Sequence, residues 1–131
     1  MKTYPIPIVI LLSIIFVFSS CNKDNDNPTP DIYGSWIVLQ TDSQGQSYNV
    51  ELRFNNDNSY DWILLDTIEG HTNSHAEFNL IENVMVITDD ADCEFEAEYL
   101  LIKESNKLAI ISVSEECGPR ANALEYLWER K

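Results

Sequence analysis

Residues 48–55 read Tyr-Asn-Val-Glu-Leu-Arg-Phe-Asn, a strict alternation of apolar and polar side chains. A period of two places the apolar members on one face and the polar members on the other, which is typical of a half-buried β-strand. The next three residues, Asn-Asp-Asn at 56–58, tolerate the left-handed backbone of a tight turn. Apolar residues then alternate again through 60–64. Residues 48–64 are therefore predicted to form a β-hairpin.

The same pattern extends in both directions along the chain. We expect further strands at 36–41, 76–80, 84–88, 94–99, 108–113 and 124–130, separated by polar turns such as 82–83 and 105–106. The last strand is expected to point Leu124, Tyr126 and Trp128 inward. No helical stripe of ten residues and no internal repeat stands out. The fold is therefore predicted to be all-β, with about eight antiparallel strands in a meander. Closure into a barrel removes the exposed edges, and an open sandwich of the same strands is the alternative.

The first 20 residues have the features of an export signal. Lys2 provides a positive charge, and an apolar run from Ile6 to Phe18 follows. This run is too short to span a bilayer comfortably and lacks a stop-transfer flank. Two serines, at 19 and 20, then precede Cys21. We expect residues 1–20 to be a signal peptide. A plain secreted protein, in which Cys21 is incidental, is the alternative.

The cysteine placed directly after small residues resembles the bacterial lipobox, with Phe18 where leucine is usual. The resemblance implies a lipoprotein: a diacylglycerol on the Cys21 thiol, removal of the leader, and acylation of the new amino group, with palmitate as a typical chain. Several acyl chains give stable anchoring. It also implies an outer-membrane location, on the periplasmic or the cell-surface face.

The segment 21–32 is predicted to be the acylated cysteine and a disordered tether. Residues 22–31 contain two prolines and no hydrophobic residue, so they cannot bury apolar surface. Lys23, Asp24 and Asp26 resemble the surface-export signal of some Gram-negative lipoproteins. A bland solvated linker is the alternative.

The charge restricts the partners of the chain. The formal net charge is −14, and removal of Lys2 with the leader leaves 7 basic and 22 acidic residues, a charge of −15. Nucleic acid is excluded as a partner because its phosphates require lysine and arginine. Anionic lipid headgroups are disfavoured for the same reason. The remaining residues, about one hundred, suit one domain, so 33–131 is predicted to be a single barrel.

Cys93 and Cys117 form an even pair once Cys21 is assigned to lipid. Disulfides persist in exported proteins, so we predict a bridge, with two free thiols as the alternative. A three-residue turn centred on Ser105 would place the two cysteines directly opposite each other. A two-residue turn at 105–106 shifts the pairing by one residue and still permits a diagonal bridge. Such a bridge stabilises by roughly 3 kcal/mol.

The front strand opens with Gly34-Ser35-Trp36, and this Gly-x-Trp resembles the lipocalin motif. The resemblance implies that Trp36 plugs the closed end of the barrel and that a basic residue packs across its ring by a cation–π contact. Arg130 is the candidate, and Arg120 is the second choice. The segment 117–120, Cys-Gly-Pro-Arg, and Trp128 also resemble small lipocalin-like domains of bacterial lipoproteins.

Residues with chemical potential are few. The acidic segment 89–94 lacks the glycine that an EF-hand loop needs, so a solvated loop is favoured over a Ca²⁺ site. His71 and His75 would lie about 13 Å apart on one strand face, too far for one metal. The glutamates at 94, 96 and 98 are expected to face water. No catalytic or phosphate-binding motif appears. We therefore expect neither an enzyme nor a bound metal or cofactor.

A barrel of about eight strands encloses room for one small apolar ligand. The expected function is that of a membrane-anchored extracytoplasmic lipoprotein that binds a small hydrophobic ligand. The alternative is a surface interaction module with a packed core, no ligand and a protein partner. The inward-facing candidates for ligand contact are Tyr48, Val50, Leu52, Phe54, Tyr60, Trp62, Phe78, Tyr99 and Tyr126.

Overall fold

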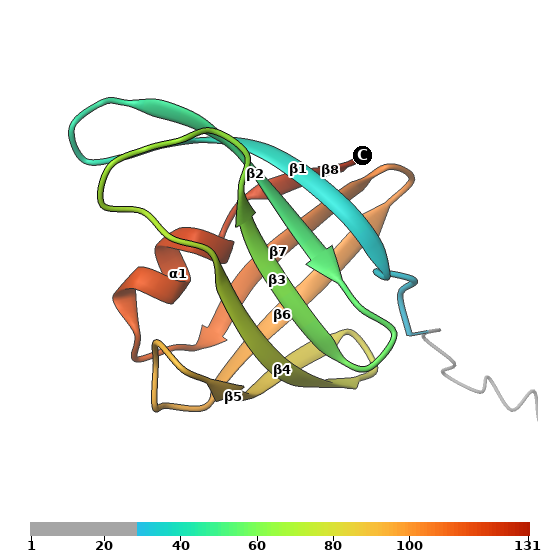
Figure 1. The fold of residues 1–131 in the computed structure, drawn as a ribbon. Helices are drawn as coiled ribbons and strands as arrows, with labels where there is room; N and C mark the ends of the chain where they lie inside the picture. The colour runs from blue at the N-terminus through green and yellow to red at the C-terminus, as the bar shows by residue number, and fades with distance from the viewer. Residues whose placement is uncertain (1–28) are drawn as a thin grey trace, which may run out of the picture.

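The computed structural model describes residues 29–131. The predicted signal peptide, Cys21 and most of the predicted tether lie outside the described residues. Eight antiparallel strands follow one another in chain order and close into a barrel, and a short helix, α1 (Gly118–Leu124), precedes the last strand (Figure 1). The strands are β1 (Gly34–Thr41), β2 (Ser47–Phe54), β3 (Ser59–Leu64), β4 (Ser74–Ile81), β5 (Val84–Asp90), β6 (Ala97–Glu104), β7 (Lys107–Ser114) and β8 (Leu127–Arg130).

Pairing between the first and last strands closes the barrel. Trp36 of β1 is opposite Arg130 of β8, and Ile37 is opposite Glu129. Every strand therefore has two neighbours, which leaves no free sheet edge. The predicted eight-stranded meander and its closure are confirmed, and the open sandwich is wrong.

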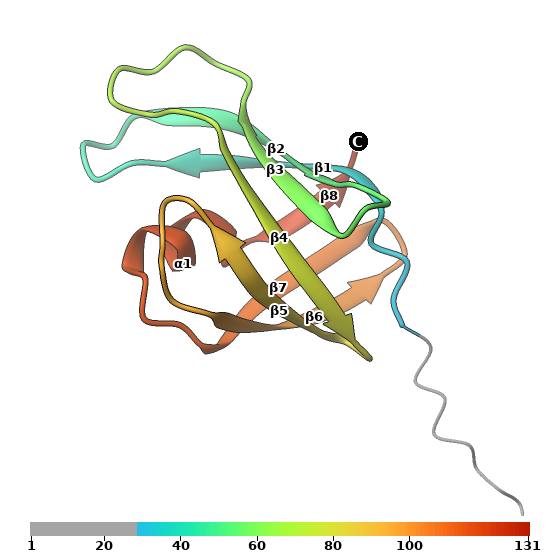
Figure 2. The same cartoon turned by 60° about the horizontal axis from the view of Figure 1, so that its bottom comes forward.

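The two ends of the barrel differ in their connections. Short turns join β2 to β3, β4 to β5 and β6 to β7 at one end, with left-handed backbone at Asn58 (φ 61°), Glu82 (φ 55°) and Ser105 (φ 54°). At the other end lie the connections 42–46, 65–73, 91–96 and 115–126, the last of which contains α1. Figure 2 shows α1 and these longer loops together at one end, opposite the C-terminus. We call these the short-turn end and the loop end.

The short-turn end is filled by aromatic side chains. Trp36 and Trp128 are fully buried, and Phe54 and Phe78 meet edge to face with ring centroids 5.6 Å apart. The Trp36 indole N–H donates to the carbonyl of Ile32 at 2.7 Å. The close packing of these side chains and the hydrogen-bonded indole N–H make this end a solid core.

Arg130 lies across the Trp36 ring, with its guanidinium carbon 4.1 Å from the ring centroid. Its Nη1 also donates to the Tyr33 carbonyl at 2.5 Å. Gly34 makes room for this contact, since a Cβ there would lie 3.0 Å from Arg130 Nη1. The φ of Gly34, +107°, is in addition a conformation that L side chains rarely adopt.

Two of the predicted strand boundaries are wrong. Leu124 ends α1, and the last strand begins only at Leu127. Pro119 suits the first turn of a helix, and a helix of seven residues is too short to produce a periodic stripe. Similarly, β6 begins at Ala97, and residues 94–96 belong to the preceding loop. The Phe95 carbonyl there accepts from Arg120 Nη2 at 2.6 Å instead of joining the strand ladder.

The predicted disulfide between Cys93 and Cys117 is present, with 6.1 Å between the Cα atoms. The β6–β7 hairpin has the two-residue turn, because Glu104 pairs with Lys107, so the three-residue turn is wrong. A register shift at Glu98 follows near the loop end. Both cysteines lie beyond the paired strands, so the bridge ties the 91–96 loop to the start of α1.

Candidate binding cavity at the loop end

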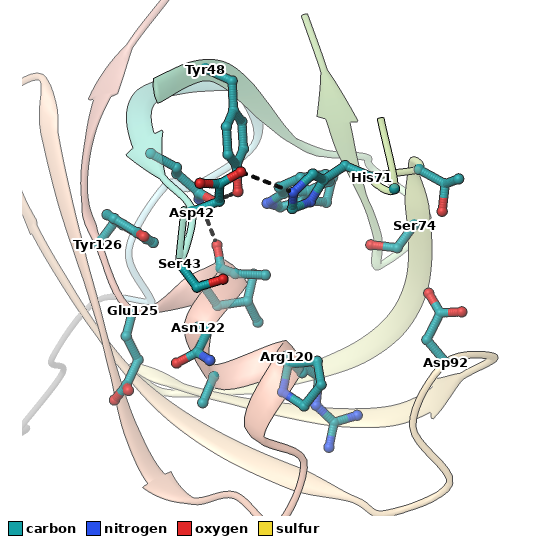
Figure 3. Close-up of a pocket in the computed structure, with 18 of the residues that line it drawn as sticks. Asp42, Ser43, Tyr48, His71, Ser74, Asp92, Arg120, Asn122, Glu125 and Tyr126 are labelled. Atoms are coloured by element: carbon teal, nitrogen blue, oxygen red, sulfur yellow. Dashed lines mark hydrogen bonds and ion pairs between the residues drawn. The ribbon is translucent and has the colours of Figure 1, made fainter. Parts of the chain in front are cut away.

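A cavity of about 1170 Å³ opens at the loop end of the barrel. Its walls come from the ends of the strands, from all four loop-end connections and from α1. Figure 3 shows labelled lining residues arranged around this space, including Tyr48 and His71 on one side and Asn122 and Arg120 of α1 on another. The cavity therefore lies opposite the solid core of the short-turn end.

Aromatic side chains form part of the wall. Tyr48 meets Trp62 edge to face, with ring centroids 6.4 Å apart. The Tyr48 ring also lies against the His71 imidazole, at 5.0 Å between centroids. Tyr60 and Tyr126 line the same space. Burial, followed by the Asp90 carboxylate, raises the pKa of Tyr60 well above its ordinary value, so its hydroxyl stays protonated and neutral.

Trp62 has an unpaired polar group in this wall. Its side chain is only 6% exposed, and its indole N–H has no hydrogen-bond partner among residues 29–131. The other two tryptophans donate to backbone carbonyls, Trp36 to Ile32 and Trp128 to Leu124. A buried donor without an acceptor costs about 1–3 kcal/mol. Among the buried side-chain donors of residues 29–131, the Trp62 N–H is thus the one left without a partner.

Arg120 anchors the floor of the cavity through a buried ion network. Its Nε donates to Glu115 Oε2 at 2.7 Å, and its Nη1 donates to Asp90 Oδ2 at 3.2 Å. The three side chains are at most 5% exposed. The Tyr99 hydroxyl donates to Glu115 as well. Burial alone would raise the pKa of Glu115, but the bonds from Arg120, Tyr99 and the Cys117 N–H outweigh it and lower that pKa.

Polar contacts also fix the rim. Asp42 Oδ1 accepts from the backbone N–H groups of Gln44 and Gln46, both at 2.9 Å, which shapes the 42–46 turn. Asp42 Oδ2 lies 3.9 Å from His71 Nε2. Gln40 of β1 donates to the Ala123 carbonyl of α1 at 2.9 Å. Together with the disulfide and Arg120, this bond holds α1 in place as a wall of the cavity.

The lining carries a strong negative charge. Arg120 is the only lysine or arginine among the described residues that line the cavity, and Glu115 and Asp90 neutralise it. The carboxylate residues in the lining are Asp42, Glu69, Asp90, Asp92 and Glu125.

The predicted ligand-contacting residues divide into two groups. Four of them, Tyr48, Tyr60, Trp62 and Tyr126, line the cavity. The other five are buried in the barrel interior and are not among the lining residues: Val50, Leu52, Phe54, Phe78 and Tyr99. Alternation along a strand identifies the inward face, but it does not specify the depth at which a side chain lies.

Sequence reasoning missed the polar half of the site. Asp42, His71 and Asn122 lie in connections, where no periodicity operates, and Gln40 looks like an ordinary strand residue. Arg120 was noticed only as a second choice for the contact with Trp36. The usable signal was the length of the four connections at one end, because loops on a rigid scaffold commonly carry binding residues.

No group of three or more histidine, cysteine, aspartate or glutamate side chains in residues 29–131 is arranged to hold a metal ion. Asp90 of the acidic segment pairs with Arg120. The two histidines have different partners: His71 lies in the cavity wall, and His75 Nδ1 contacts Asp61 at 2.6 Å. None of the helices in the described range is long and apolar enough to cross a membrane.

The fold and the site together define a small closed β-barrel with an acidic and aromatic cavity at one end. A scan against protein-family models found no matching family. Searches of the curated proteins and of the solved structures found no match either.

Proposed function

We propose that the protein is a membrane-anchored extracytoplasmic lipoprotein whose lipocalin-like barrel binds a small hydrophobic ligand. The observation that carries the proposal is the cavity of about 1170 Å³, which has tyrosine and tryptophan in its walls. Small-molecule sites are commonly concave spaces of about 300–1000 Å³ with aromatic walls and a few polar groups. A surface interaction module without a ligand needs no such space, so the cavity favours ligand binding.

The proposed anchor joins the barrel at the end away from the cavity. The chain enters the barrel at the short-turn end, where the Asp31 carbonyl accepts from Arg130 and the Tyr33 hydroxyl donates to Asn58. The cavity opens at the other end. A lipid on Cys21 would therefore be joined to the barrel at its solid end, opposite the opening of the cavity. Lipidation itself is supported by the lipobox resemblance and would be lost in a Cys21→Ser protein, which should no longer fractionate with membranes.

The binding proposal is tested with Nile red, a neutral apolar dye, and a pair of serine variants. Ser74 lines the cavity, whereas Ser114 is exposed and lies outside the lining. We expect the chain from Asn22 to Lys131 to bind the dye, and Ser74→Trp to weaken binding at least roughly tenfold by placing a large side chain in the space. Ser114→Trp should bind as the parent does. Equal binding by both variants would place the dye elsewhere and remove the support for the proposal.

A further inference from the structure

The charge of the cavity selects against anions. Five carboxylate residues line it, of which Asp90 is paired with Arg120, and the whole chain has a net charge of −14. The one guanidinium in the described lining offers no free face to an acid, because Arg120 already donates through Nε and Nη2 to Glu115 and through Nη1 to Asp90. A cleft of one sign raises the local concentration of ligands of the opposite sign. A cationic group is thus favoured at the rim.

The aromatic wall suits the same kind of ligand. Tyr48, Trp62 and Tyr126 line the space, and Tyr48 is braced by His71 at 5.0 Å and by Trp62 at 6.4 Å. Aromatic faces attract ammonium groups, and they also provide area for a flat apolar body. The carboxylates and the aromatic rings therefore point to one ligand class.

The unpaired indole N–H of Trp62 adds a separate requirement. This N–H belongs to a lining residue whose side chain is 94% buried, and it has no acceptor among residues 29–131. A protonated amine has only donors and cannot satisfy it. A hydroxyl, carbonyl or similar acceptor on the ligand would supply the partner that this N–H lacks.

We infer that the cavity takes a compact organic cation: a protonated amine on an aromatic or apolar body that also bears a hydrogen-bond acceptor for the Trp62 N–H. The ammonium group lies toward the rim carboxylates, and the acceptor lies against the wall formed by β2 and β3. This inference rests on the proposed function and narrows its ligand from a hydrophobic molecule to a cationic one.

Three phenols that differ in charge test the inference by calorimetry on the chain from Asn22 to Lys131. Tyramine is cationic, 4-ethylphenol is its neutral analogue, and 4-hydroxyphenylacetate is anionic. We expect tyramine to bind at least roughly tenfold more tightly than 4-ethylphenol, and the anion more weakly than both. Equal or tighter binding of 4-ethylphenol or of the anion overturns the inference and leaves the proposed function standing.

The same titrations separate failure of the inference from failure of the proposed function. If Nile red binds in the cavity and none of the three phenols does, the cation inference is wrong and ligand binding survives. If neither the dye nor any phenol binds, both are wrong.

Three variants locate the contacts. Trp62→Phe keeps the ring and removes the N–H, so it should weaken tyramine several-fold but leave phenethylamine, which lacks the hydroxyl, unchanged. Equal effects on the two amines would refute the role of the N–H.

Asp92→Asn should weaken tyramine binding by about threefold, whereas Glu94→Gln removes the same charge outside the lining and should have little effect at physiological salt. Equal losses of tyramine affinity in Asp92→Asn and Glu94→Gln would refute recognition of the ammonium group by the carboxylates at the rim.

Discussion

Removal of the Arg120 guanidinium should be among the most destabilising single changes in the barrel. Arg120→Met leaves Glu115 and Asp90 without a counter-charge, and both carboxylates are at most 5% exposed. Breaking a buried ion pair from one side typically costs 3–5 kcal/mol, because the remaining charge is desolvated and unpaired. Total stabilities of small domains are about 5–15 kcal/mol. We therefore expect Tm to fall by roughly 15–30 °C.

Urea denaturation followed by tryptophan fluorescence measures this loss, and Arg53→Met is the matched control. Arg53 pairs with Glu51 across 2.7 Å, but its side chain is 47% exposed and Lys131 still pairs with Glu51 when Arg53 is lost, so the loss should cost at most about 1 kcal/mol. Adding Glu115→Gln and Asp90→Asn to Arg120→Met should recover part of the stability, because no buried charge then remains. A loss below about 1 kcal/mol for Arg120→Met would refute the assignment of this network as a buried, charged one.

Three further changes have defined outcomes. Gly34→Ala should cost about 1–3 kcal/mol in thermal unfolding, because φ is +107° and the new Cβ would lie 3.0 Å from Arg130 Nη1; a change under about 0.5 kcal/mol contradicts this. The bond from Lys131, with those from other neighbours, lowers the pKa of Glu51 to about 2 from 4.5. The ionised Glu51 carboxylate therefore contributes at most roughly 3 kcal/mol to the free energy of unfolding. This contribution is complete above pH 4.5 and disappears as the pH falls toward 2. Glu51→Gln should flatten the dependence of unfolding free energy on pH in that window, and an unchanged slope would be inconsistent with the shift. Replacing both bridged cysteines, at 93 and 117, by serine should cost roughly 3 kcal/mol and abolish any effect of dithiothreitol on stability; persistent sensitivity to the reductant would count against the bridge.

The fold was predictable because its main signal is local. Alternation through residues 48–55 and the Asn-Asp-Asn turn after it already determine a hairpin, and the structure pairs Val50 with Leu64 and Phe54 with Tyr60. Repetition of the pattern along the chain then leaves few architectures that have no free edge. Helix α1 was missed because tertiary contacts, including the bond from Gln40 to the Ala123 carbonyl, hold it in place, and no periodic pattern reveals such contacts.

The site was only half predictable for the same physical reason. Tyr48 and Trp62 lie on strands, so their inward direction followed from the period of two. Asp42 and His71 lie on connections, whose course depends on contacts between distant parts of the chain. The expectation of a hydrophobic ligand therefore rests on the aromatic residues, which the pattern reveals, and takes no account of the carboxylates around the cavity, which it does not reveal.

Native mass spectrometry of the chain from Asn22 to Lys131, purified without detergent from an oxidising compartment, tests ligand binding in the cavity most directly. We predict an additional small mass that is lost on denaturation and is absent from Ser74→Trp but present in Ser114→Trp. That result would place a ligand in the cavity at the loop end and would supply the mass needed to identify it. A bare mass, together with no uptake of Nile red or of any of the three phenols, would contradict the account.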